Sequence, residues 1–134
     1  MYETDIMKLF GLLFIVFIGG NSANAQRAMV FDSVLVIMNT TNPDQETEVA
    51  VSAFKKIKML EYVGEDLTVK RFGISYVSGD KANLFVKQGI SNRFNNDWAL
   101  KAIEVKAQKV YFQEIKIEGK DTLFTTSLII RLKY

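Results

Sequence analysis

Three carboxylates, Asp80, Asp97 and Glu114, are the side chains of this sequence best suited to catalysis. The chain has no histidine and no cysteine, which excludes a Ser-His-Asp site, a Cys-His site and the usual zinc ligands. A hydrolase with a carboxylate pair remains open, because that mechanism needs only one acid and one base. The acidic residues mostly stand in turns or alternate with lysines. The sequence therefore favours a protein that is not an enzyme and uses no cofactor or metal.

Other functional motifs and charge patterns are weak. Residues 89–93 (GISNR) lack the closing glycine of a G-x-S-x-G nucleophile motif, and there is no phosphate-binding glycine loop. The chain carries 17 basic and 15 acidic residues, a net charge of +2 that is too small and too evenly spread for nucleic acid. Its densest basic spots, Lys55–Lys58 and Lys70-Arg71, are typical of solvated strand faces.

Three tyrosines suggest a second kind of binding chemistry. Tyr62, Tyr76 and Tyr111 would stack on a sugar ring if they shared one exposed strand face, which keeps a small carbohydrate-binding module open as an alternative. Packing in or near the core explains each ring more simply.

Residues 1–25 have the pattern of a secretory signal peptide. Lys8 precedes the apolar run Leu9–Ile18, and Ala23-Asn24-Ala25 has the small-x-small pattern of a signal-peptidase cleavage site. The run is about half of the ~20 residues that span a bilayer as a helix. We expect Met7 to be the initiator and cleavage to fall between Ala25 and Gln26. The protein would then be periplasmic or secreted without a stable membrane anchor, the alternative being an uncleaved anchor.

Residues 26–134 are expected to form a single, mainly β domain with one short helix. The almost continuously apolar Ala28–Met38 predicts one central strand buried on both faces, and residues 39–45 (NTTNPDQ) a turn. Residues 46–63 fit both a helix and strands, and the alternation within them favours strands.

The middle of the domain alternates more clearly. Residues 67–77 predict a strand with a bulge at Lys70-Arg71, residues 78–80 a turn, and residues 82–86 a short strand. Residues 95–97 (NND) supply an N-cap for the helix, in which Trp98 would be a core anchor.

The C-terminal residues predict a hairpin of strands 109–118 and 122–134 around the turn 119–121. A bulge between Phe112 and Ile115 would place both on the core side. The apolar face of this hairpin needs a second layer, which predicts a β-sandwich. The outer edge of the last strand, near Arg131, would be free to add a strand from a partner protein or from a second copy of the chain.

Several strings of this sequence resemble the C-terminal periplasmic domain of GldM and PorM, the shaft proteins of the type IX secretion and gliding motor in Bacteroidota. They are LEY (60–62), VKRFGISYVSG (69–79), GISNRFNNDWALKAI (89–103), KVYFQEIKIEGKDTL (109–123) and LIIRL (128–132). The resemblance implies an Ig-like β-sandwich and a protein–protein interaction role in the envelope, and it carries over no catalytic residue. The shaft proteins are longer and keep a transmembrane helix, whereas we expect a cleavable signal and one domain here.

Overall fold

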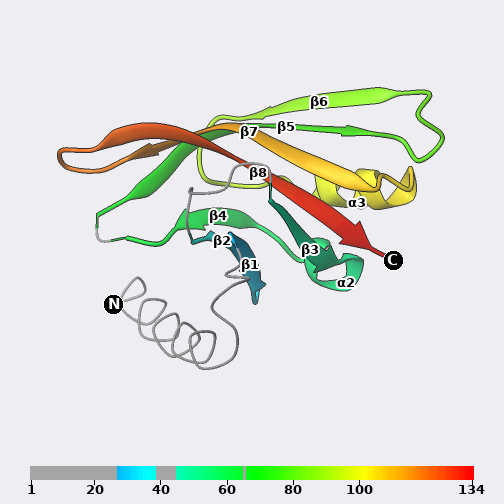
Figure 1. The fold of residues 1–134 in the computed structure, drawn as a ribbon, viewed down its shortest axis with the longest axis horizontal. Coiled ribbons are helices and arrows are strands. Elements are labelled where there is room, and N and C mark those ends of the chain that lie inside the picture. Colours follow the sequence, from blue (N-terminus) through cyan, green and yellow to red (C-terminus); the bar gives the residue numbers. More distant parts are fainter. Residues whose placement is uncertain (1–26, 39–44, 65) are drawn as a thin grey trace.

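The fold, seen in a computed structural model, is mainly β and consists of two sheets (Figure 1). The structure describes residues 27–38, 45–64 and 66–134. The predicted signal peptide, its cleavage site between Ala25 and Gln26, and most of the predicted turn 39–45 lie outside these residues. In chain order the elements are β1 (Ala28–Phe31), β2 (Val34–Ile37), β3 (Glu46–Ala50), α2 (Val51–Phe54), β4 (Met59–Tyr62), β5 (Thr68–Val77), β6 (Leu84–Gly89), α3 (Asn96–Glu104), β7 (Lys109–Glu118) and β8 (Leu123–Lys133).

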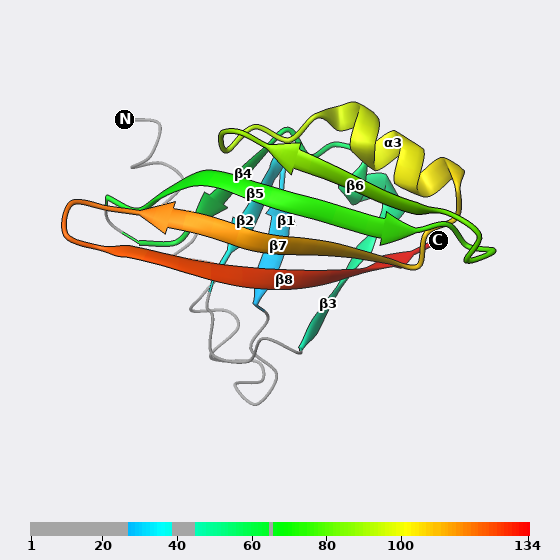
Figure 2. The same cartoon turned by 90° about the horizontal axis from the view of Figure 1, so that it is seen from above.

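The larger sheet has five strands in the order β3-β8-β7-β5-β6, and the smaller has the order β1-β2-β4. Strands β5 to β8 pair antiparallel, whereas β3 joins β8 and β4 joins β2 in parallel. The small sheet and α3 lie on the same face of the large sheet, and no described element covers its other face (Figures 1 and 2). The prediction of a mainly β sandwich is confirmed.

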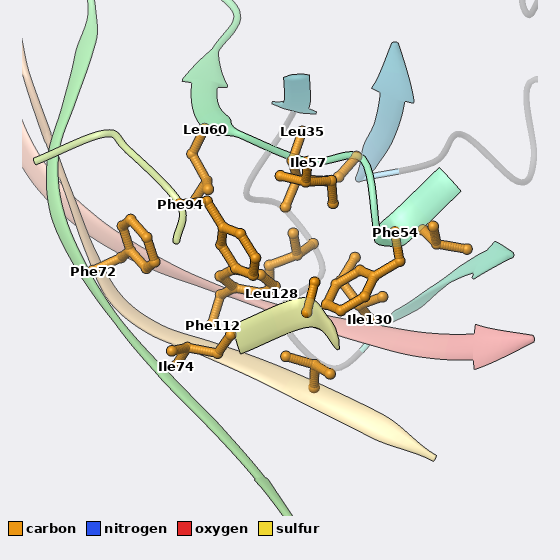
Figure 3. Packing of buried hydrophobic residues seen from close by; sticks show 14 of the residues in the cluster. Leu35, Phe54, Ile57, Leu60, Phe72, Ile74, Phe94, Phe112, Leu128 and Ile130 are labelled. Atoms are coloured by element: carbon orange, nitrogen blue, oxygen red, sulfur yellow. The ribbon is translucent and has the colours of Figure 1, made fainter. Parts of the chain in front are cut away.

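The core lies between the layers and is rich in aromatic rings (Figure 3). Phe94, in the loop before α3, contacts Phe72 of β5, Phe112 of β7 and Phe54 of α2, with ring centroids 5.8–6.3 Å apart. Phe94 is only 4% exposed and, since it also contacts Trp98 of α3, it links the large sheet to both α2 and α3. The fully buried aliphatic side chains around these rings include Leu35, Ile57, Leu60, Ile74, Ile115, Ile117, Leu128 and Ile130.

The prediction of a single strand over Ala28–Met38 is wrong. The segment is a hairpin in which Phe31 pairs with Val34 across the two-residue turn Asp32-Ser33. Asp32 has φ 57°, a left-handed conformation that Asp tolerates better than most residues. The segment is apolar on both faces because each face packs against apolar side chains. One face contacts the main core, and on the other face Val34 and Val36 form the buried part of a second apolar cluster.

Residues 46–63 contain two strands separated by a single helical turn. Thr47 and Val49 of β3 are buried and alternate with the exposed Glu48 and Ala50, which accounts for the alternation. The turn α2 buries Phe54 and accounts for the helical spacing. The preference for strands is therefore correct for β3 and β4, and the domain contains α2 in addition to the one helix expected.

Both predicted bulges are present. The β7–β8 register shifts between Phe112 and Ile115, and both side chains are fully buried as a result. Glu114 lies inside this bulge with φ 48°. The β5–β7 register shifts on both sides of Arg71.

Helix α3 begins as predicted, because the Asn95 side chain accepts a hydrogen bond from the backbone N–H of Asp97 at 3.0 Å. Trp98 packs against the core as expected, edge-on to Phe72 and Phe94, although it is only partly buried. No helix within the described part of the chain is long and apolar enough to cross a membrane.

Candidate interaction surface

The three candidate carboxylates stand on different parts of the fold. Asp80 lies in the turn between β5 and β6, Asp97 in the first turn of α3, and Glu114 in the bulge of β7, and all three are exposed. In the described ranges, no group of three or more acidic residues is placed to hold a metal ion. The fold therefore gives these acids no shared site for acid–base chemistry.

Asp80 has a local structural role. Its carboxylate accepts hydrogen bonds from the Ser78 hydroxyl at 2.5 Å and from the Ala82 backbone N–H at 2.9 Å. The Ser78 hydroxyl, and then the Ala82 amide, hold the pKa of Asp80 below its ordinary value. A general acid at neutral pH needs a shift in the opposite direction. Asp80 is thus suited to holding the turn closed.

The three candidate tyrosines do not share a face. Tyr76 is buried against Phe85, with ring centroids 5.1 Å apart. Tyr62 is half-buried on the core side of β4 and packs edge-on to Phe124. Tyr111 pairs with Ser75 and Ile129 across the large sheet, on the face away from the core. They form no aromatic platform for a sugar.

The prediction that the last strand offers a free edge is wrong. Arg131 on β8 pairs with Lys109 of β7 on one side and with Glu48 of β3 on the other. Strand β3 reaches β8 from about 80 residues earlier in the chain, and no local pattern indicates this parallel pairing. The edges of the large sheet are therefore β3 and β6.

The two edges differ in character. At the β3 edge, Glu46 pairs with Lys109 at 2.5 Å and Glu48 with Lys133 at 3.9 Å. Charged side chains of this kind disfavour the addition of another strand.

Strand β6 is the outermost strand on its side of the large sheet (Figure 2). Its Leu84 is 67% exposed and its Val86 is 63% exposed, and Val77 of β5, which pairs with Leu84, is also exposed. Lys87 is the only charged residue of β6. This edge is apolar and open.

The backbone groups of β6 that face outward can be identified. The Ser78 N–H donates to the Asn83 carbonyl at 2.9 Å, which marks residues 78 and 83 as a hydrogen-bonded pair. Because such pairs alternate along an antiparallel ladder, the N–H groups of Leu84, Val86 and Gln88 point away from β5. No described strand pairs with this side of β6.

The β6 edge continues into a mixed surface on the open face of the large sheet. The register places Val86, Ser75, Tyr111, Ile129 and Glu46 in one row across all five strands. The row is apolar or neutral from β6 to β8 and ends in an acid at β3. We call Val77, Leu84 and Val86, with the outward amides of β6, the β6 surface. The sequence predicted a short strand over residues 82–86, whereas β6 spans Leu84–Gly89, and no feature of the sequence identified it as an edge.

These features define a small two-sheet β domain in which, among the described strands, the large sheet has one charged edge and one apolar edge. The chain matches no protein-family model, no curated protein and no solved structure.

Proposed function

We propose that this protein is a non-catalytic, exported protein of the bacterial envelope that binds a partner protein through the β6 edge. The observation that carries the proposal is the contrast between the edges, since β3 is charged and β6 presents Leu84 and Val86 to solvent. The scattered acids and the structural hydrogen bonds of Asp80 add support.

Binding at β6 is by strand addition. An extended segment of the partner accepts hydrogen bonds from the amides of Leu84, Val86 and Gln88 and covers the apolar side chains beside them. Fully burying an exposed Leu or Val side chain contributes about 1.5–3 kcal/mol. The burial of two such side chains, together with a few backbone hydrogen bonds, is consistent with reversible binding of moderate affinity.

The cellular context of the proposal comes from the sequence. The signal pattern ending at Ala25 directs the chain to the periplasm or beyond. The resemblance to the GldM and PorM domain links it to type IX secretion or gliding. Its partner is then an envelope protein of that machinery, or a second copy of the chain that pairs through the same edge.

The test is partner recovery from envelope fractions by the C-terminally tagged chain. Val86→Pro removes an outward N–H without removing a hydrogen bond to β5, so it leaves the domain folded and abolishes recovery. Leu123→Ala is the matched control, because Leu123 is an equally exposed apolar residue at the far end of the β7–β8 hairpin. Full recovery by a folded Val86→Pro protein contradicts binding at β6.

A further inference from the structure

Arg27 is a buried cation with almost no partner. It is the residue before β1 and is fully buried, at 0% exposure. Its Nη2 makes one long hydrogen bond, 3.4 Å, to the Thr126 hydroxyl of β8. Its Nε and Nη1 have no hydrogen-bond partner among the described residues. Of the five N–H donors that a guanidinium carries, most are therefore unused.

No anion balances this charge among the described residues. The ion pairs there join Lys101 to Glu104, Lys109 to Glu46 and Lys133 to Glu48, and none includes Arg27. Burial lowers the pKa of the Arg27 guanidinium from its ordinary value, as expected for a cation removed from water, and an arginine nonetheless stays charged at neutral pH. A buried charge without a partner is strongly unfavourable.

The surroundings of Arg27 suit an anion. Burial lowers the pKa of the guanidinium, and the nearby Tyr62 raises this pKa to a lesser extent. The Tyr62 ring packs edge-on to Phe124 at 5.4 Å. The hydroxyl of Thr126 lies beside the guanidinium, and the phenol of Tyr62 is a second neutral donor in the neighbourhood. Apolar surroundings strengthen any charge–charge contact formed there, because the local dielectric constant is low.

We propose that Arg27 is the anchor of a binding site for a small oxyanion, a carboxylate or a phosphate. The planar guanidinium matches both groups through paired N–H donors. Thr126 and Tyr62 complete the site from β8 and β4. The bound oxyanion supplies the missing counter-charge beneath the β7–β8 hairpin and stabilises the contact between the two sheets. This site is separate from the β6 surface and does not depend on it.

The test is thermal unfolding of the full chain in sodium acetate, sodium phosphate and sodium chloride at equal ionic strength. In wild-type protein, acetate or phosphate raises the Tm by about 3 °C or more over chloride, with saturation. A response to acetate alone assigns the site to carboxylates, and a response to phosphate alone assigns it to phosphate groups. A wild-type Tm that is the same in all three salts overturns the proposal.

Two variants locate the effect. Arg27→Met removes the charge and keeps the length of the side chain, so it loses the anion-dependent shift and melts no lower than wild type in chloride. Arg93→Met, at an exposed arginine, keeps the shift. Retention of the shift by Arg27→Met overturns the proposal, as does a marked loss of Tm for that variant in chloride. In NMR spectra, the Arg27 Nε–H signal of wild type moves on titration with the active anion, which assigns binding directly.

Discussion

Phe94 is expected to be the residue on which the packing of the two layers depends most. It is 4% exposed and its ring contacts four others, those of Phe54, Phe72, Trp98 and Phe112, with centroids 5.7–6.3 Å apart. Truncating a buried Phe to Ala costs about 3–5 kcal/mol. That is a large part of the ~5–15 kcal/mol by which a domain is stable.

The expected loss of stability for Phe94 can be compared with that for Trp98. It is larger than Phe94 but only partly buried, and it contacts two of the same rings, Phe72 and Phe94. Its truncation therefore costs less, about 2–3 kcal/mol, because part of the ring is already in water. We expect Phe94→Ala to be the more destabilising of the two substitutions.

Urea unfolding followed by far-UV circular dichroism measures both changes, provided the slope m is unchanged. The double variant should show a coupling of about 0.5–1.5 kcal/mol between the two rings. Ile90→Ala, at a side chain that is 91% exposed, is the control and should stay within about 0.5 kcal/mol of wild type. A smaller loss for Phe94→Ala than for Trp98→Ala would refute the assignment of Phe94 as the central packing residue.

Three further predictions concern single positions. Gly89→Ala places a Cβ 2.6 Å from two carbons of the buried Phe72 ring and should cost about 1–3 kcal/mol in urea unfolding. Glu114→Gly relieves the left-handed backbone of the β7 bulge and should raise stability by up to about 1 kcal/mol; a loss would show that the Glu114 side chain supports the bulge. The pKa of Asp80 is depressed in the folded state, so its stabilising effect is present above pH 3.8, its unfolded value, and is lost as the pH falls below it. Ser78→Ala should weaken this acid-dependent loss in unfolding curves recorded at successive pH values.

Local patterns in the sequence were sufficient to predict a structural feature where one face of a strand is apolar and the other is polar. Side chains alternate between the two faces of a strand, so Phe112 and Ile115 would lie on opposite faces of a regular strand. A bulge between them is the simplest way to place both on the core side. The cap at Asn95 likewise depends only on neighbouring residues. The hairpin β1–β2 was missed because its two faces are both apolar, and such a segment has no alternation to interrupt.

The candidate surfaces depend on contacts between distant segments. Strand β8 is not an edge because β3 pairs with it, and parallel pairing of short strands leaves no local mark in the sequence. The isolation of Arg27 is likewise invisible in the sequence, since an arginine beside a strand is ordinarily solvated. In the fold, Arg27 is fully buried and its guanidinium reaches Thr126 of β8.

The chemistry of the β6 edge also limits what can bind there. Leu84 and Val86 lie on the open face of the large sheet, whereas Lys87, which pairs with the core-facing Ile74, lies on the opposite face. An added strand therefore meets apolar side chains on one face and one cation on the other. A segment with β-branched residues at alternate positions and an acid on the other face satisfies both requirements. Self-pairing through β6 brings two copies of Lys87 to the same face without an acid on either strand. The sequence of β6 thus favours a different protein over a second copy as the partner.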